Sequence, residues 1–370
     1  MRIFVGSYYT DHGWQKDQTV EMRDGQIVAV YDGCHEADRL AAYLVPGFFD
    51  THNHGGEGFD ATSLDREALA RFLLRSASCG VTDILITLLT SDVSVMEDEL
   101  AFIRRAMDEQ AAGTLGGSRI RGVHLEGPFL NSQKAGAQEL SAILAPDVSL
   151  FEARFAPFSD IIRLVTLAPE QEGADELIAY LLSRGIPVQA GHTAASYEEA
   201  EVAFSRGVRS VCHTFNACAP LHHREPGIVG AALLDERVYC EAIADLVHLH
   251  PGTLRLMARC CGADRMVLVS DSTMPKGLPD GRYWYANSRV IVKNGERRCE
   301  NGALNGGLCY LDESVRRLVG IGIPLWDAVT MAGVTPWRRL ALSRGEEAHF
   351  VLLDEKLCPT ATCIGGVWYE

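Results

Sequence analysis

Six histidine and carboxylate side chains of this 370-residue sequence stand where they could bind a metal ion. They are His52, His54, Glu126, His192, His213 and Asp271. Each lies at or near the end of an apolar run of the kind that forms a buried strand. Imidazole and carboxylate are the usual protein ligands of Zn, Fe and Mn, and a catalytic site leaves one position open for water. A bound divalent ion lowers the pKa of that water to about 7 and polarises a carbonyl group under attack.

The spacing of two of these histidines favours a shared ion. His52 and His54 are two residues apart, so on an extended strand both imidazoles lie on one side. A single histidine at a strand end is more often an ordinary core or surface residue. Four of only twelve histidines at such positions favour a common site. Asp271 would take a proton from the attacking water and return it to a leaving amine.

The elements that must position these side chains are strands that alternate with helices. Amphipathic stretches such as 66–80, 174–185 and 197–207 each end in a glycine, where a helix is expected to end. Alternation of this kind predicts parallel βα units, and eight units predict a closed (β/α)8 TIM-type barrel with its site at the carboxyl ends of the strands. The eight apolar runs are 44–50, 83–89, 120–126, 161–167, 187–192, 208–215, 238–245 and 266–271.

Both ends of the chain have a different texture. Residues 1–45 and the last thirty read as short strands and turns, and Asp24-Gly25 stands between two alternating runs as in a β-hairpin. We therefore predict a small β-sandwich domain built from both chain termini. It comprises residues 1–45 plus 336–370, and the barrel comprises residues 46–335.

Composition limits the possible partners. The net charge of −15 argues against nucleic acid or an anionic membrane as a partner. No window approaches the roughly 18 apolar residues of a membrane span, and the first residues do not read as a signal peptide. Eleven scattered cysteines predict reduced thiols and a cytoplasmic location. Because the protein is acidic overall, an anionic substrate would need a positively charged side chain close to its binding site.

Six segments together resemble the N-acetylglucosamine-6-phosphate deacetylases of the amidohydrolase superfamily. The resemblance runs in order over nearly the whole chain, and it implies hydrolysis of N-acetylglucosamine 6-phosphate to glucosamine 6-phosphate and acetate in amino-sugar catabolism. The segments are PGFFDTHNHGGEGFD, GVHLEGPFLN, AGHTAAS, HTFNACAPLHHREPG, IADLVH and LVSD.

The resemblance implies roles for the six residues. Glu126, His192 and His213 match the principal metal ligands. His52 and His54 match the ligands of a second ion, with Glu126 bridging, so one or two divalent ions per subunit are expected. Zn, Fe and Mn all remain open as the metal. Asp271 matches the general acid/base that also faces the metal.

The resemblance also implies how a sugar phosphate is held. Asn216 and Ala217 match positions that bind it, and His248 matches a substrate-contacting histidine. Arg224 matches an arginine that reaches the phosphate from the neighbouring subunit, which implies a homodimer. Its guanidinium would supply the local cation, with paired donors that suit phosphate.

Three departures from the family leave the substrate open. Gln138 stands where the family has a histidine near the acetyl carbonyl, and glutamine cannot titrate. Leu246 replaces a small residue beside His248, and residues 304–307 read Leu-Asn-Gly-Gly instead of Leu-Ala-Gly-Ser. The alternatives are N-acetylgalactosamine 6-phosphate or a cyclic amide as substrate, and, as a different class, a catalytically silent metal-binding or regulatory protein.

Overall fold

The fold is built around one sheet of eight parallel strands, in a computed structural model that describes residues 1–285, 288–299, 302, 304–345 and 347–370. The strands follow the order β14-β13-β12-β11-β10-β9-β8-β5. Each overlaps one of the eight apolar runs, so the predicted strands are confirmed. They are β5 (Phe48–Asp50), β8 (Val81–Leu88), β9 (Arg119–Glu126), β10 (Ile162–Leu167), β11 (Val188–Ala190), β12 (Ser210–Val211), β13 (Tyr239–Ile243) and β14 (Met266–Val269).

The two edges of this sheet meet just beyond the carboxyl ends of β5 and β14. Asn53 and Ser272 form a parallel bridge there. The His54 N–H donates to the Ser272 carbonyl at 2.8 Å, and the Asp271 N–H donates to the His52 carbonyl at 3.0 Å. The sheet therefore closes into the predicted barrel, and the closure itself sets the two histidines beside Asp271.

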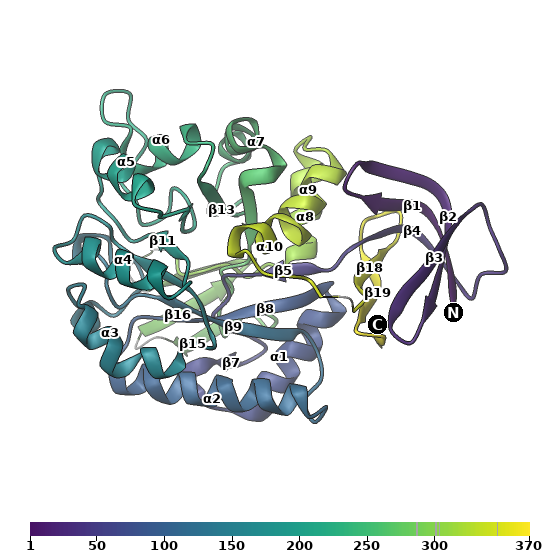
Figure 1. Cartoon of the computed structure of the whole chain (residues 1–370), viewed down its shortest axis with the longest axis horizontal. Helices are drawn as coiled ribbons and strands as arrows, with labels where there is room; N and C mark the ends of the chain where they lie inside the picture. The colour runs from purple at the N-terminus through teal and green to yellow at the C-terminus, as the bar shows by residue number, and fades with distance from the viewer. Residues whose placement is uncertain (286–287, 300–301, 303, 346) are drawn as a thin grey trace.

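Helices alternate with the strands and surround the barrel (Figure 1). Every residue of β8 is buried, because one face of the strand packs inside the barrel and the other packs under helices. None of the helices in the described ranges is long and apolar enough to cross a membrane. The helices are α1 (Arg66–Ser78), α2 (Val93–Ala111), α3 (Val148–Arg154), α4 (Ala174–Ser183), α5 (Tyr197–Ser205), α6 (Gly227–Leu234), α7 (Pro251–Arg265), α8 (Leu311–Gly320), α9 (Leu325–Gly333) and α10 (Thr335–Leu340).

The two ends of the chain form a separate, mostly β domain, as predicted. Figure 1 shows the purple N-terminal strands beside the yellow C-terminal strands, and the Asp24-Gly25 turn joins β2 to β3. Hydrogen bonds link seven strands into one sheet, in the order β20-β19-β18-β4-β1-β2-β3. The exact division at residues 45 and 336 stays a prediction. The strands are β1 (Arg2–Thr10), β2 (Gly13–Arg23), β3 (Gln26–Asp32), β4 (Arg39–Pro46), β18 (His349–Leu353), β19 (Pro359–Ile364) and β20 (Val367–Tyr369).

One apolar run is divided between the two domains. Residues 44–50 were predicted as a single barrel strand, but β4 ends at Pro46 in the terminal sheet and β5 begins at Phe48 in the barrel. Gly47 makes the passage possible, because a Cβ there would lie 2.1 Å from the Thr82 hydroxyl oxygen. The chain thus enters the barrel through a point of close packing where a side chain would clash.

A third sheet lies between β14 and α8 and was not predicted. It consists of β15 (Gly281–Tyr285), β16 (Ser288–Lys293) and β17 (Glu296–Cys299), paired antiparallel. The turn between β16 and β17 is Asn294-Gly295, a strong hairpin signal that the sequence did contain. A small hairpin formed by β6 (Gly55–Gly56) and β7 (Phe59–Asp60) follows β5. We call β15–β17 the roof sheet, because residues in and after it line the cavity described below.

A buried carboxylate joins the terminal sheet to the barrel. Asp83, on β8, accepts hydrogen bonds from Arg121 Nε and from the Thr82 hydroxyl, and it lies 3.1 Å from His349 Nδ1. Burial alone would raise the pKa of Asp83, but His349 and Arg121 together hold it below its usual value. Because the pKa is depressed in the folded state, the ionised carboxylate stabilises the fold above about pH 4.

Asp83→Asn should lower the free energy of unfolding by about 3 kcal/mol at pH 7, because Arg121 and His349 lose their buried carboxylate partner. The difference from the unmodified protein should shrink as the pH falls below about 4, where Asp83 itself becomes protonated. Urea denaturation at pH 7 and pH 3 measures both values. Asp160→Asn, at an exposed ion pair with Arg104, is the control and should cost at most about 1 kcal/mol. A difference for Asp83→Asn that is equal at both pH values contradicts the assignment.

Candidate metal centre

All six side chains that the sequence singled out come together at the carboxyl ends of the barrel strands. Glu126 lies at the centre. Its Oε1 atom is 3.0 Å from His213 Nε2, 3.2 Å from His192 Nε2 and 3.4 Å from His52 Nε2. The two Nε2 atoms of His192 and His213 are 3.2 Å apart. Glu126, His192 and His213 thus outline one position for an ion.

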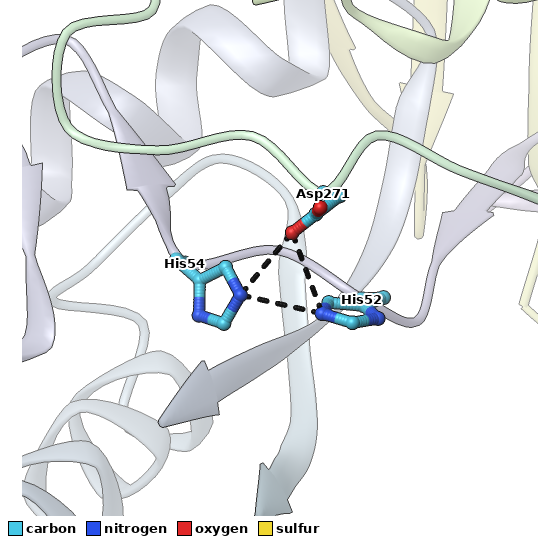
Figure 2. Close-up of side chains that lie close together, drawn as sticks. All are labelled: His52, His54 and Asp271. Atoms are coloured by element: carbon cyan, nitrogen blue, oxygen red, sulfur yellow. Dashed lines mark hydrogen bonds and ion pairs between the residues drawn. The ribbon is translucent and has the colours of Figure 1, made fainter. Parts of the chain in front are cut away.

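The other carboxylate oxygen of Glu126 faces a second group of side chains. His54 Nε2 is 3.4 Å from Glu126 Oε2 and 3.2 Å from Asp271 Oδ1. His52 Nε2 is 3.3 Å from His54 Nε2 and 3.5 Å from Asp271 Oδ1. Figure 2 shows the two imidazoles and the Asp271 carboxylate pointing toward one another. Glu126 lies between this group and the first, as a bridging ligand would.

The spacing of these atoms fits a divalent ion. Ligands at about 2.0–2.2 Å from a tetrahedral centre lie about 3.3–3.6 Å from each other. The distances within the two groups are 3.0–3.5 Å. Imidazole nitrogens crowd in this way when their lone pairs share a cation. The donor set is therefore suited to one ion or two, and it does not select between Zn, Fe and Mn.

Three of the four imidazoles have a partner at Nδ1 that keeps the Nε2 lone pair aimed inward, whereas His213 Nδ1 is buried without a partner among the described residues. His54 Nδ1 lies 3.1 Å from the Thr87 carbonyl and His192 Nδ1 lies 2.8 Å from the Lys134 carbonyl, so each Nδ1–H donates. His52 Nδ1 is 3.0 Å from Glu241 Oε2. Donation at Nδ1 leaves Nε2 unprotonated in the neutral ring, the form that binds metal.

The cluster attracts positive charge. Burial alone would raise the pKa of Glu126, but the imidazoles of His52 and His192 lower it well below the usual range. Burial has the same effect on Asp271, and His52 and His54 overcome it and lower the pKa to about 2. Burial alone would lower the pKa of His52. Nearby acidic groups, first Cys212 and then Glu126, outweigh burial and raise the pKa well above its usual value. Buried carboxylates among imidazoles therefore bind cations, whether protons or metal ions.

The backbone at three of the six residues is strained. His192, His213 and Asp271 have φ angles of +46°, +23° and +45°, in the left-handed region. Such conformations cost about 1–3 kcal/mol each in a residue other than glycine, and they persist only where the surrounding structure imposes them. At these points the chain leaves its strand, and the side chain turns into the mouth of the barrel.

A cavity opens directly above the cluster. Asn216, Ala217, His248 and Gln138 line it together with five of the six cluster residues, all except His52. Arg224 is not among its lining residues; it lies on an exposed loop, where its Nη1 atom is 2.8 Å from His223 Nε2. The structure thus brings four of the five predicted substrate residues to the cavity of the same chain.

Leu246, one of the departures from the family pattern, lies in a strained turn beside His248. Leu246 has a φ of +61°, a conformation that favours glycine, so the small residue usual at this position relieves strain. Asp245 holds this turn, because its carboxylate accepts hydrogen bonds from the Val247 and His248 N–H groups and contacts His248 Nδ1 at 2.6 Å. The side chain of His248 is fixed despite the strain at Leu246.

Gln138 occupies the place predicted for a substrate contact but is engaged by the protein. Its Nε2 atom donates to Glu126 Oε2 at 2.5 Å, and its Oε1 atom accepts from the Thr90 N–H at 2.7 Å. The amide therefore orients the central carboxylate. A glutamine at this position supports the cluster without needing to titrate.

Relatives of known activity match the chain over most of its length. An N-acetylgalactosamine-6-phosphate deacetylase from Escherichia coli is 34% identical over 357 residues, which cover 94% of this chain and 93% of the relative. An N-acetylglucosamine-6-phosphate deacetylase from Vibrio furnissii is 33% identical over 340 residues, with 90% and 84% covered. The chain belongs to the N-acetylglucosamine-6-phosphate deacetylase family. It is therefore a hydrolase of the amidohydrolase superfamily. No family model matches the chain.

Solved structures of this deacetylase family agree with the fold. The N-acetyl-D-glucosamine-6-phosphate deacetylase of Mycobacterium smegmatis superimposes with a TM-score of 0.93 at 30% identity, covering 100% of this chain and 99% of that one. That structure is of a variant in complex with N-acetyl-D-glucosamine-6-phosphate. A Xaa-Pro dipeptidase, at 13% identity and a TM-score of 0.60, shares the fold alone.

Two buried residues that hold the cluster in place, Glu241 and Arg339, were not predicted from the sequence. Glu241 is fully buried on β13, where it contacts His52 and accepts hydrogen bonds from the His213 N–H and from Arg339. Arg339, on α10, also donates to Thr51. A carboxylate inside the apolar run 238–245 was the available signal, because a buried charge needs a partner.

Proposed function

We propose that this chain is a metal-dependent deacetylase that hydrolyses N-acetylglucosamine 6-phosphate to glucosamine 6-phosphate and acetate. The observation that carries the proposal is the cluster of six ligand-type side chains at 3.0–3.5 Å, at the base of a cavity lined by Asn216, Ala217 and His248. The relatives named above give the substrate class. A cytoplasmic location belongs to the same proposal and rests on the cysteine content alone.

The residues of the chain divide the chemistry between them. His52, His54, Glu126, His192 and His213 would hold one or two divalent ions, with Glu126 bridging. When bound, such ions supply an activated water and polarise the amide carbonyl. Asp271 lines the cavity, so it is placed to take a proton from the attacking water and to deliver it to the amine as the carbon–nitrogen bond breaks. A carbon–oxygen bond forms in the same reaction, and acetate leaves.

A second candidate substrate is N-acetylgalactosamine 6-phosphate. The observation that favours it is the Escherichia coli relative of that name, which is about as similar to this chain, at 34% identity, as the N-acetylglucosamine-6-phosphate deacetylase from Vibrio furnissii, at 33%. The two sugars differ only in configuration at C4. Neither Gln138, which contacts Glu126, nor Leu246, which is strained, distinguishes them.

An acetate-release assay tests the proposal. Purified protein reconstituted with Zn²⁺, Mn²⁺ or Fe²⁺ should release acetate from at least one of the two sugar phosphates, with kcat/KM above about 10⁴ M⁻¹s⁻¹. A cyclic amide, the third predicted substrate class, serves as the comparison. Absence of turnover of both sugar phosphates by protein whose metal content has been verified would remove the proposal and favour a silent metal-binding protein.

We include in this proposal a homodimer in which Arg224 reaches the neighbouring cavity, which agrees with its exposed position outside its own cavity. Arg224→Ala should raise KM by about 10-fold or more, because a charge-assisted hydrogen bond is worth about 1.5–3 kcal/mol. Hybrid dimers with Asp271→Asn should regain activity, since one of their two sites then carries neither change. Mixed dimers as inactive as both parents would contradict a contribution from the neighbouring subunit.

A further inference from the structure

A second cavity, which we call the side cavity, adjoins the cavity above the metal-binding cluster. Its volume is about 610 Å³, compared with about 160 Å³ for the cavity above the cluster. Residues 89–93 after β8 and several residues of 137–144 after β9 line it, and Val95, Leu144 and Trp284 give it apolar surface. Neither metal binding nor the proposed contacts with the sugar phosphate use this space.

A few side chains form the boundary between the two cavities. Among the described residues, Leu89, Ala137 and Tyr285 line both cavities. Leu89 and Ala137 are only half-buried, whereas Tyr285 is buried. The side chain of Ala137 is a single methyl group. The boundary is therefore thin and apolar at these two residues.

This boundary lies beside the central carboxylate of the cluster. Gln138, the neighbour of Ala137, donates from its amide to Glu126 Oε2 at 2.5 Å. The same amide accepts from the N–H of Thr90, the neighbour of Leu89, at 2.7 Å. A group bound at the metal centre is thus separated from the side cavity by little more than the side chains of the boundary.

The barrel places this boundary opposite the proposed sugar contacts. In the closed barrel β8 and β12 are four strands apart in either direction. Leu89 follows β8, whereas Asn216 and Ala217 follow β12. An amide held over the cluster with its sugar phosphate on the β12 side therefore directs its acyl group to the β8 side, toward the side cavity.

The charge of the side cavity agrees with this orientation. Asp60, Asp92 and Glu139 line it, and no lysine or arginine is among its described lining residues. Hydrogen bonds from the Ser94 N–H and hydroxyl group lower the pKa of Asp92, so its carboxylate is ionised at neutral pH. Such a cavity repels the phosphate end of the substrate and suits a neutral group.

We propose that the side cavity is an acyl subsite, so that the chain hydrolyses hexosamine 6-phosphates whose N-acyl group is a neutral, unbranched chain longer than acetyl, such as butyryl. This inference rests on the proposed deacetylase function and widens its substrate class. The reaction is unchanged: water oxygen bonds to the acyl carbon, the carbon–nitrogen bond breaks, the amine takes up a proton and butyrate leaves. Leu89 and Ala137 control the acyl length.

The first test uses the unmodified protein reconstituted with metal. It compares kcat/KM for the N-butyryl and N-acetyl forms of whichever hexosamine 6-phosphate is deacetylated faster, measured by release of the common amine. The N-butyryl value should lie within about 10-fold of the N-acetyl value, because a single methylene group that a pocket does not accept already costs about 10- to 200-fold.

An N-succinyl substrate tests the charge of the subsite. Its acyl chain has the same length as butyryl but ends in a carboxylate, which Asp60, Asp92 and Glu139 would repel. Its kcat/KM should be at least about 10-fold below that of the N-butyryl form. Equal values for the two substrates would show that the acyl chain does not enter the side cavity.

Ala137→Leu tests the passage between the cavities. The larger side chain should lower the ratio of the N-butyryl to the N-acetyl value by about 10-fold or more. Ala135→Leu is the matched control, because Ala135 belongs to the same loop and is not among the described residues that line either cavity. It should keep the ratio. A general loss of activity cancels, since both values come from one protein.

Two outcomes overturn the inference. One is an N-butyryl value more than about 10-fold below the N-acetyl value in the unmodified protein, a result that does not depend on the folding of any variant. The other is a ratio in folded Ala137→Leu within about 2-fold of the unmodified ratio. Failure of the proposed function is separate, because the unmodified protein would then release no acetate from the N-acetyl form of either epimer.

Discussion

Asp271→Asn should lower kcat by about 10³-fold while the protein stays folded and keeps its metal. General acid/base catalysis contributes about 10²- to 10⁴-fold, and asparagine can neither accept nor deliver the proton. The side chain lines the cavity, with Oδ1 at 3.2 Å from His54 Nε2. Because five other ligand-type side chains remain, bound metal should persist. Steady-state kinetics and elemental analysis on the same sample measure both effects.

The control for this variant is Asp312→Asn. Asp312 is also a buried aspartate, at the start of α8, where it pairs with Arg316 and faces no part of the cavity. Its replacement should leave kcat within about 2-fold of the unmodified value, the range of a change remote from chemistry. A kcat for Asp271→Asn within about 10-fold of the unmodified value would mean that another group moves the proton.

The arrangement of strands and ligands was predictable because it depends on periodicity. Eight apolar runs alternate with helices, and parallel strands in a barrel share one carboxyl end. His52 and Asp271 are far apart in sequence, yet they follow the two strands at which the barrel closes. Their meeting therefore follows from the strand count alone, and so does the gathering of Glu126, His192 and His213 on the strands between.

The features that escaped prediction depend on packing and on local backbone geometry. The roof sheet forms around the buried side chains of Arg297 and Tyr285, and Arg297 stands in the charged stretch 296–298, which gives no sign that it is buried. The sequence does not indicate the left-handed backbone conformation of Leu246, because leucine rarely adopts it. Arg224 lies on an exposed loop outside the cavity of its own chain, so its proposed contact with a neighbouring subunit depends on a surface that one chain does not contain.

Glu126→Gln should greatly reduce the content of bound metal and lower kcat/KM by about 10³-fold or more. Both oxygens of Glu126 face imidazole nitrogens at 3.0–3.4 Å. An amide would carry no charge, and its NH₂ group would point at lone pairs meant for the metal. Loss of a partner outside the ligand shell already costs about 10- to 100-fold, so loss of a central ligand should cost more. Elemental analysis and kinetics at saturating Zn²⁺ measure the result.

Glu99→Gln is the matched control for this variant. Glu99 is a buried carboxyl group on α2 whose pKa is raised well above the usual value by burial, and an amide resembles its protonated form. That variant should keep its metal and its activity. Chelation of the unmodified protein should reproduce the loss seen in Glu126→Gln, and added metal should reverse it. Full metal content in Glu126→Gln would show that the metal is held without Glu126, for example by His52, His54 and Asp271.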